Sequence, residues 1–276
     1  MEQQKIYLIT GASQGLGLSL VKYLLQKNQT VIVTTRDAGK FDPLLRKNAD
    51  LEVYGLDLTS EEAVKNMIGD IIEKHGRIDV LINNAGYGFV GAIEETSSEE
   101  EQQVIAVNVH APLRMIRLVL PHMRKMQNGH IINLSSIAGI IGSGGWGMYN
   151  ASKFAVEGFS EALYHEVIEF GIKVTVVAPS AIRTNFLGGS LTSSKLEMKE
   201  YANSSGKRRQ TLAANNGKQP IDPEKAAAAI YDVIQMTNPP FRLLLGKEAY
   251  ERASKKLEQL KADYEGMKAV TLSTEF

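Results

Sequence analysis

The sequence predicts an α/β fold in which helices cover both faces of one parallel sheet. Short apolar runs typical of buried strands alternate along the chain with longer patterns of helical period. A glycine-rich turn joins the first strand-like run to the first helical pattern, and no Pro/Gly/Ser-rich linker divides the 276 residues. Strands that alternate with helices pair in parallel through right-handed crossovers. We therefore expect a single domain over residues 1–276.

The expected elements follow one another in regular order. Strand-like runs fall near residues 5–10, 30–35, 51–56, 78–83, 130–135, 172–178 and 241–245. Helical patterns fall near residues 15–27, 61–75, 99–126, 149–170, 223–236 and, in the tail, 248–265. The Gly-, Ser- and Asn-rich segment 185–219 interrupts this order, and a long segment of this kind is typically a lid or a binding loop. We expect 185–219 to be a substrate lid. The C-terminal extension 248–276 would cover either the substrate cleft or a neighbouring subunit.

The turn after the first strand has the composition of a phosphate-binding site. Its sequence is Gly11-Ala12-Ser13-Gln14-Gly15-Leu16-Gly17. Glycine lets the backbone come close to an anion, and a helix N-terminus offers free N–H groups and a positive dipole to a pyrophosphate. A purely structural turn is the alternative. The strand before this turn and the helix after it favour a dinucleotide-binding site instead.

The end of the second strand carries the residues that choose between NAD(H) and NADP(H). An acid there accepts from the ribose 2′-hydroxyl of NAD(H), whereas an Arg favours the 2′-phosphate of NADP(H). Thr35 ends the strand, Arg36 follows it, and Asp37 tempers the positive charge. With Ser13 and Thr35 as hydroxyl donors and Arg36 as the charge partner, we favour NADP(H). Binding of NAD(H), with Arg36 as a plain surface residue, is the alternative.

Tyr149 and Lys153 are the candidate catalytic pair. Four residues apart on a helical pattern, they lie on one face, one turn from each other. A cation about 4 Å from a phenol, at an effective dielectric of about 20, contributes roughly 4 kcal/mol, or up to about three pKa units. We therefore expect Lys153 to lower the pKa of Tyr149 towards neutrality, where a general acid–base works best. An ordinary helix with a solvated Lys is the alternative.

With these motifs the chain resembles a classical short-chain dehydrogenase/reductase over roughly residues 5–235. The resemblance implies that Tyr149 and Lys153 are the family's catalytic Tyr and Lys. Ser136, thirteen residues before Tyr149, matches the catalytic Ser, with Ser135 as the second choice, and Asn108 matches the catalytic Asn. The implied cofactor-binding residues are Gly11, Ser13, Gln14, Gly15, Leu16, Gly17, Thr35, Arg36, Asp57, Leu58, Asn84, Ala85, Gly86, Tyr149, Lys153, Pro179, Ile182 and Thr184.

The resemblance also implies a topology and a reaction. The topology is a Rossmann fold with a seven-stranded parallel sheet in the order 3-2-1-4-5-6-7. The reaction is hydride transfer between NADP(H) and a carbonyl or secondary alcohol, as in steroid and retinol dehydrogenases and similar bacterial oxidoreductases. Tyr149 would donate the proton, Ser136 would donate to the carbonyl oxygen, and Lys153 would bind the nicotinamide ribose. Asn108 would hold a water that links Lys153 to solvent. The family also implies a homodimer or homotetramer.

Two positions depart from the family's pattern. Ser180 stands where the family usually has Gly after Pro179, beneath the nicotinamide. Gln14 stands where one NADP-preferring branch carries a basic residue, which leaves Arg36 to bind the phosphate almost alone. A dinucleotide-binding sensor without chemistry is the alternative from another class of protein. The intact catalytic set argues against it, because a pure binder has no need of the phenol.

Composition narrows the partners and the compartment. Lys and Arg together number 31, as do Asp and Glu, so we expect no nucleic-acid partner. The chain has no Cys, and its five His residues show no ligand spacing, so we expect no metal site. No run approaches eighteen apolar residues, and the first strand begins too early for a signal peptide. We therefore expect a cytoplasmic protein without a membrane partner.

The loops beyond the strand ends bear on the substrate. Their apolar side chains suggest a pocket for an apolar carbonyl or alcohol, although they do not define which one. The residues are Ile93, Ile140, Ile141, Trp146 and Phe186. Trp146 either walls this pocket or packs its own loop. The basic run at 207–209 is either a solvated face or a partner for an acidic substrate or the cofactor phosphates.

Overall fold

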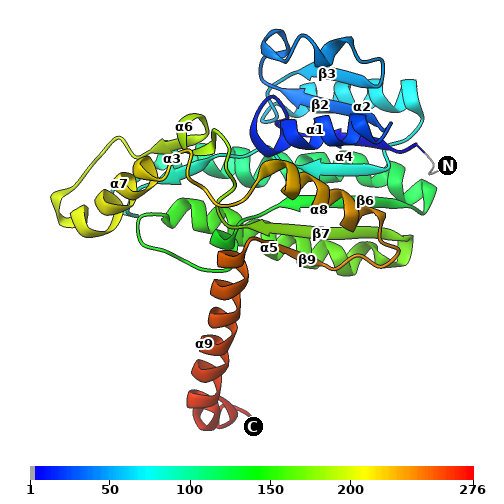
Figure 1. Ribbon diagram of the computed structural model, residues 1–276. Coiled ribbons are helices and arrows are strands. Elements are labelled where there is room, and N and C mark those ends of the chain that lie inside the picture. Colours follow the sequence, from blue (N-terminus) through cyan, green and yellow to red (C-terminus); the bar gives the residue numbers. More distant parts are fainter. Residues whose placement is uncertain (1–3) are drawn as a thin grey trace.

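The computed structural model describes residues 4–276, and within them seven parallel strands form one sheet (Figure 1). The sheet order is β3-β2-β1-β4-β6-β7-β9. The strand bounds are Leu51–Gly55 (β3), Thr30–Thr35 (β2), Ile6–Ile9 (β1), Val80–Asn83 (β4), Gly129–Leu134 (β6), Ile172–Pro179 (β7) and Arg242–Leu245 (β9). Counted along the chain within this sheet, the order is 3-2-1-4-5-6-7, so the predicted fold is confirmed. The order reverses at β1 and β4, where α/β sheets bind ligands.

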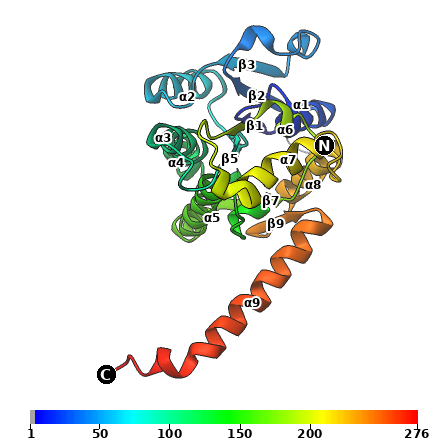
Figure 2. The ribbon, with the colours of Figure 1, turned by 90° about the vertical axis from the view of Figure 1, so that its left-hand side faces the viewer.

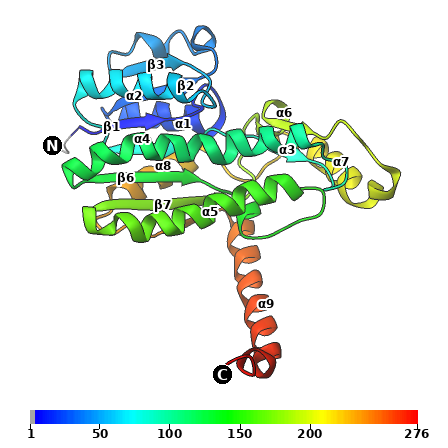
Figure 3. The same ribbon diagram turned by 180° about the vertical axis from the view of Figure 1, so that it is seen from behind.

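Helices cover both faces of the sheet (Figures 1 and 3). On one face lie α1 (Gly15–Gln26) and α8 (Pro223–Gln235); on the other lie α2 (Glu61–His75), α4 (Ala111–Met126) and α5 (Gly147–Val167). Successive side chains of β1 point to opposite faces. Tyr7 and Ile9 join the core under α1 and α8, whereas Ile6 and Leu8 join the core under the other three helices. Because both faces are buried, the central strands β1 and β4 consist almost entirely of apolar residues.

A long helical run packs against one face of the sheet. It consists of α3 (Ser98–Ile105), a π-helical turn (Ala106–His110) and α4. By length and composition, Ser98–Met126 is apolar enough to cross a membrane. Core helices of α/β folds meet the same description, and here Met115, Val119 and Met123 are buried against the sheet. The absence of a membrane partner stays a prediction.

The remaining elements lie beyond the carboxyl ends of the strands. They are β5 (Gly88–Val90), its partner β8 (Leu191–Ser193), α6 (Phe186–Gly189) and α7 (Lys207–Ala214). The C-terminal helix α9 (Lys247–Leu272) starts at the end of β9 and projects away from the body (Figure 2). The predicted tail helix is therefore confirmed and longer than expected. Single helical turns occur at Ala38–Lys40, Leu45–Lys47, Ile137–Gly139, Ile168–Phe170, Lys199–Tyr201 and Ala202–Gly206.

Candidate active site

The glycine turn between β1 and α1 has no room for a side chain at Gly11 or Gly17. Gly11 and Gly15 have φ angles of +65° and +61°, in the left-handed region that favours glycine. A Cβ on Gly17 would lie 2.6 Å from Asn84 Nδ2 and 2.8 Å from Gly11 O. The turn brings the N-terminus of α1, with its N–H groups and positive dipole, to the carboxyl edge of the sheet. This arrangement is a cradle for an anion such as a pyrophosphate.

Hydrogen bonds hold the glycine turn between β4 and the segment 185–219. Thr10 Oγ1 accepts from the backbone N–H groups of Asn84 and Ala85, each at 3.0 Å. Asn84 Nδ2 donates in return to the carbonyl oxygens of Thr10 and Gly11, each at 2.9 Å. On the other side, Gln14 Nε2 donates to Ser190 Oγ at 3.0 Å. Gln14, which stands where one NADP-preferring branch carries a basic residue, therefore links the glycine turn to the segment 185–219.

The end of β2 presents Thr35 and Arg36 to the same cavity. The carboxylate of Asp37 is engaged within its own turn, where it accepts from Gly39 N–H at 2.9 Å and pairs with Lys40 Nζ at 3.3 Å. The hydrogen bond from Lys40 lowers the pKa of Asp37, and the one from Gly39 lowers it further. The negative charge that argues against a bound phosphate is thus already paired with Lys40.

Ser136, Tyr149 and Lys153 come together where β6 ends and α5 begins. Tyr149 and Lys153 are each only 7% exposed. The Ser136 hydroxyl lies close enough to the Tyr149 phenol to lower its pKa, and it accepts from Ala138 N–H at 3.1 Å. Ser135, the second choice, directs its Oγ to Ser136 O at 3.5 Å. The geometry therefore favours Ser136 over Ser135 as the partner of the phenol.

Lys153 does not act on Tyr149 as the spacing predicted. Its Nζ donates to Leu134 O at 2.8 Å and lies 5.8 Å from the centroid of the Tyr149 ring. Burial raises the pKa of Tyr149 to about 12, and the Ser136 hydrogen bond only partly opposes this. Burial also lowers the pKa of Lys153 to about 8, against the effect of Glu157. The expected fall in the Tyr149 pKa is wrong for the protein's own groups, because desolvation of the phenol dominates.

Asn108 lies in the π-helical turn, behind the cavity wall and 2% exposed. Its Oδ1 accepts from Tyr87 N–H at 3.0 Å, while its Nδ2 donates to Tyr87 O at 2.9 Å and to Ser152 Oγ at 3.1 Å. A Cβ on Gly86 would lie 3.2 Å from Asn108 Oδ1 and 3.7 Å from Lys153 Nζ. Asn108 therefore joins the segment after β4 to α5 close to Lys153. Its role in holding a water stays a prediction.

The segment after β7 lies across from the glycine turn. A Cβ on Gly15 would lie 3.4 Å from Thr184 Cβ, and Thr184 Oγ1 accepts from Phe186 N–H at 3.2 Å. The Ser180 hydroxyl is buried and has no hydrogen-bond partner among residues 4–276. It occupies the space that Gly246 leaves, since a Cβ there would lie 2.8 Å from it. The unusual Ser180 thus packs against the start of α9.

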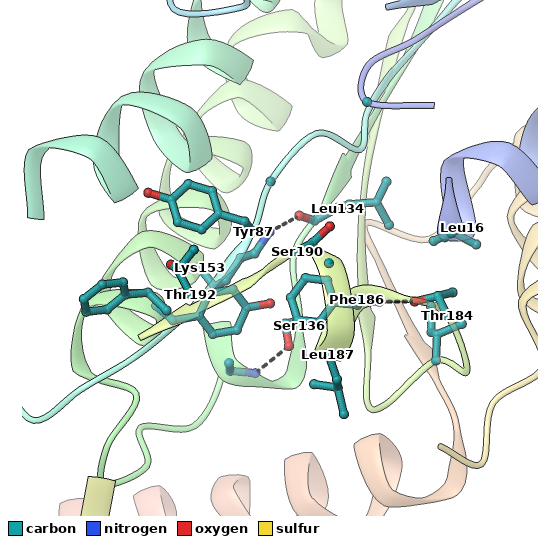
Figure 4. A pocket seen from close by; sticks show the side chains of 18 of the residues that line it. Leu16, Tyr87, Leu134, Ser136, Lys153, Thr184, Phe186, Leu187, Ser190 and Thr192 are labelled. Atoms are coloured by element: carbon teal, nitrogen blue, oxygen red, sulfur yellow. Dashed lines mark hydrogen bonds between the residues drawn. The ribbon is translucent and has the colours of Figure 1, made fainter. Parts of the chain in front are cut away.

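A cavity of about 1110 Å³ connects the glycine turn with Tyr149 (Figure 4). In Figure 4, Lys153 and Tyr87 lie on one side of this space, and Leu16 and Thr184 lie on the other. Asn108 does not line the cavity. The predicted residues that do are Gly11, Ser13, Gln14, Gly15, Leu16, Gly17, Thr35, Arg36, Asp57, Leu58, Asn84, Ala85, Gly86, Ser136, Tyr149, Lys153, Pro179, Ile182 and Thr184.

Aromatic rings wall the cavity around Tyr149. The centroids of the Trp146 and Phe186 rings lie 4.7 and 6.4 Å from that of Tyr149, and both residues line the cavity. Trp146 is therefore part of the pocket wall. The three isoleucines predicted beside them are not. Ile93 is exposed, while Ile140 and Ile141 pack towards α9.

A buried ion pair fastens the segment 185–219 to the loop after β5. Glu95 is 1% exposed and accepts from Ala92 N–H at 2.8 Å and from Met198 N–H at 2.9 Å. Arg209 Nη2 lies 3.0 Å from its Oε2. Burial alone would raise the pKa of Glu95, but these hydrogen bonds and one from Ser205 lower it to about 2. Arg209 is thus a structural partner of Glu95, and the predicted solvated face does not describe it.

Several residues that line the cavity near Tyr149 were not predicted from the sequence. They are Tyr87, Phe89, Ser143, Asn150, Leu187, Thr192, Arg208, Leu212, Glu248 and Arg252. Arg208 was noted only as part of a basic run. Glu248 and Arg252 lie one turn apart at the start of the helix that follows the last strand, and this position at a strand's carboxyl end was an available signal.

Comparisons with known proteins agree on one family. The family model described as short chain dehydrogenase matches residues 5–194. The chain is 35% identical over 272 residues to the oxidoreductase BOA17 of Botryotinia fuckeliana, covering 98% of this chain and 99% of that protein. It is 37% identical over 244 residues to the 3-ketodihydrosphingosine reductase of Bacteroides thetaiotaomicron, covering 88% of each.

Solved structures give the same result. A short-chain dehydrogenase from Streptomyces avermitilis superposes with a TM-score of 0.93 at 36% identity, covering 99% of this chain and 100% of the other. ElxO with NADP bound gives 0.73 at 28% identity, covering 88% and 97%. A short-chain dehydrogenase/reductase from Burkholderia phymatum in complex with NAD shares the fold, with a TM-score of 0.83 at 22% identity and 95% coverage of each chain.

Proposed function

We propose a reaction for this chain, which belongs to the short-chain dehydrogenase/reductase family. In this reaction the enzyme transfers a hydride between NADP(H) and the carbonyl or secondary alcohol carbon of a small, largely apolar molecule. Family membership makes the chain an NAD(P)-dependent oxidoreductase. The observation that carries the finer proposal is the continuous cavity from the glycine turn to Tyr149. A sensor that only binds a dinucleotide has no need of a buried phenol, hydroxyl and ammonium at the end of that cavity.

The residues present fit a dinucleotide. At the glycine turn, a Cβ on Gly11 or Gly17 would collide with neighbouring atoms, so the backbone itself forms the floor of the cradle. Residues 11–17 would hold the pyrophosphate at the α1 N-terminus, and Ile182 and Thr184 would hold the nicotinamide end. When bound, the nicotinamide supplies the hydride.

Tyr149 is the proposed proton donor to the carbonyl oxygen during reduction. Its raised pKa, about 12, keeps the phenol protonated at neutral pH, as a general acid must be. The Ser136 hydroxyl, which lies beside the phenol, would turn its single proton to the same carbonyl oxygen as negative charge develops there. The ammonium of Lys153, fixed by Leu134 O, keeps positive charge beside them. In alcohol oxidation the same groups work in reverse.

NADP(H) is the proposed cofactor. Arg36 lines the cavity at the end of β2, where its guanidinium can meet a 2′-phosphate, and the Asp37 carboxylate is paired with Lys40. ElxO, which was solved with NADP bound, supports this choice, whereas the neighbour with NAD keeps the alternative open. Deciding between them requires the affinities of both cofactors.

The substrate is proposed to have an apolar body. The rings of Trp146 and Phe186 stand beside Tyr149, and Phe89 and Leu187 line the same part of the cavity. Side chains of this kind gain free energy by covering apolar surface. The relative named 3-ketodihydrosphingosine reductase, which shares 37% identity, is consistent with such a substrate.

A cytoplasmic homodimer or homotetramer is the proposed working form. Along α9, Tyr250, Leu257 and Tyr264 recur every seven residues and are 66%, 67% and 69% exposed. A seven-residue apolar repeat is typical of a helix that packs on another helix. The chain has no Cys, which is compatible with a reducing compartment. Light scattering would give the mass in solution, and Leu257→Glu should reduce it if α9 joins the subunits.

Isotope transfer tests the proposed reaction. NADPH carrying deuterium at C4 is incubated with the enzyme and a panel of aryl and long-chain ketones, and the products are analysed by mass spectrometry. We expect the deuterium on the former carbonyl carbon of at least one ketone. NADPH binding without deuterium transfer to any ketone would support the sensor alternative.

A further inference from the structure

Two arginines from distant parts of the chain line the cavity beyond Tyr149. Arg208 belongs to α7 and Arg252 to α9, and both contact the loop that precedes α5. Arg208 Nε donates to Gly144 O at 3.4 Å, and Arg252 Nη2 donates to Ser143 Oγ at 3.4 Å. The segment 185–219 and the C-terminal helix α9 thus each place one guanidinium against the same loop.

The charges of these two arginines are unequally compensated. Arg252 pairs with Glu248, its neighbour on α9, with Nη1 and Oε1 3.0 Å apart. Among residues 4–276, no carboxylate forms an ion pair with Arg208. Burial lowers the pKa of Arg208, and the nearby Arg252 lowers it further. Arg208, Arg252 and Glu248 together leave one positive charge in a partly desolvated wall, which is an unfavourable state unless an anion joins them.

The loop between these arginines and Tyr149 is fixed. Asn150 Oδ1 accepts from Ser143 N–H at 3.0 Å, while its Nδ2 donates to Ala138 O at 2.7 Å and to Ile141 O at 3.0 Å. Asn150 directly follows Tyr149 on α5, so the loop that Arg208 contacts is attached to the helix that carries the phenol. The glycine turn, which is suited to the cofactor phosphates, hydrogen-bonds instead to Asn84 and Ser190. An anion held by Arg208 would therefore stay at a defined separation from the reacting carbonyl.

We propose that the substrate carries a carboxylate and that Arg208, with Arg252 beside it, binds this group; the inference rests on the proposed function. The planar guanidinium matches a carboxylate with two parallel hydrogen bonds. One uncompensated positive charge suits a singly charged carboxylate better than a phosphate of nearly two negative charges. Together with the aromatic walls, this defines the substrate class as an oxo acid, or a hydroxy acid, with an apolar body between its two polar ends.

A matched pair of substrates tests the proposal. Reduction of 6-oxoheptanoate and of its methyl ester is followed with the NADPH-bound enzyme. We expect the wild type to favour the acid in kcat/KM by about tenfold, the usual size of one hydrogen-bonded charge pair. Arg208→Gln should abolish the preference, because KM rises much more for the acid than for the ester. Arg208→Lys should retain part of it. Lys207→Gln, at the exposed neighbour, should retain all of it.

Glu248 gives an independent test of opposite sign. Glu248→Gln frees Arg252 from its carboxylate, so the preference for the acid should rise by about threefold. A role for Arg208 in packing alone predicts no such rise. Equal kcat/KM for acid and ester in the wild type, or a preference that persists in Arg208→Gln, would overturn the proposal.

Calorimetry separates this inference from the proposed reaction. The acid and the ester are titrated into the enzyme bound to NADP, and the same tenfold preference is expected in Kd. Selective binding of the acid without hydride transfer to either compound would support the carboxylate site and contradict the proposed function. Turnover of both compounds without selective binding would do the reverse.

Discussion

The two ends of the cavity are built in different ways. The cofactor end is built mainly from backbone, since Gly11 and Gly17 leave no room for a side chain and the Asn84 amide bonds directly to the carbonyl oxygens of the glycine turn. The substrate end consists of side chains from segments far apart in the chain. Trp146 lies before α5, Phe186 on α6, Arg208 on α7 and Arg252 on α9.

This difference separates the part of the cavity that tolerates few substitutions from the part whose side chains can change. A backbone cradle at the sheet edge tolerates little substitution, because even one Cβ would collide with packed atoms. The far wall rests on the segment 185–219 and on the first turns of α9, whose side chains can vary without disturbing the sheet. We infer that the cofactor end defines the class of reaction and that the substrate end defines which molecule reacts.

The largest expected effect is at the junction of the two ends. Tyr149→Phe removes the proposed proton donor but keeps the ring that packs against Trp146. We expect kcat to fall by about 10²- to 10⁴-fold, the usual contribution of general acid–base catalysis. The affinity for NADPH, measured by fluorescence titration, should stay within about twofold. A near-normal kcat in this variant would show that another group donates the proton.

At the substrate end, Arg209→Met should loosen the segment 185–219, the proposed substrate lid. It leaves the buried carboxylate of Glu95 without its guanidinium partner, which typically costs about 3 kcal/mol or more. If substrate binding depends on the position of this segment, KM for the substrate should rise by roughly a hundredfold while Kd for NADPH stays unchanged. Lys207→Met, at an exposed neighbour, is the control. A loss of NADPH affinity equal to the loss in KM would contradict the separation of the two ends.

At the cofactor end, Gly17→Ala should weaken the binding of NADPH. The added Cβ would lie 2.6 Å from Asn84 Nδ2 and 2.8 Å from Gly11 O, so the turn must shift. Strain of this kind costs about 1–3 kcal/mol, and we expect NADPH affinity to fall by about tenfold or more. Gly69→Ala is a matched control in α2, because a Cβ there meets nothing within 4 Å. Equal effects of the two changes on NADPH affinity would argue against the cradle.

The smallest effect is expected for Arg36→Ala, which sharpens the choice of cofactor. Arg36 is exposed, so the loss of its contact with a 2′-phosphate should weaken NADPH by only about tenfold. NADH affinity should not change, and Lys47→Ala, at an exposed lysine that does not line the cavity, should change neither affinity. If Arg36→Ala left both affinities unaltered, NAD(H) would become the better assignment.

The two ends also differ in how far the sequence predicts them. The glycine turn and the pair Tyr149 and Lys153 are local patterns, and contiguous residues specify them. Glu95 and Arg209, which are 114 positions apart, form an ion pair because the short strands β5 and β8 pair and bring their segments together. Strands of three residues are too short to give a periodic signal in the sequence. Tertiary structure decides such contacts. The position of Arg252 after the last strand was predictable, but its meeting with Arg208 in one wall required the fold.

The pKa of Tyr149 shows the same limit for a local pattern. The spacing correctly placed Lys153 one turn after Tyr149, but the direction of its ammonium depends on Leu134 O at the end of β6. Burial, which no spacing reveals, then raises the pKa of the phenol instead of lowering it. Position along a helix was predictable, whereas desolvation and hydrogen-bond direction required the fold.

A crystal structure of the NADP complex tests the central claim most directly. The account predicts the pyrophosphate on residues 11–17, the 2′-phosphate beside Arg36, and the nicotinamide C4 facing the space between the hydroxyls of Ser136 and Tyr149. A nicotinamide bound outside this space, with the Tyr149 hydroxyl directed away from it, would contradict the account.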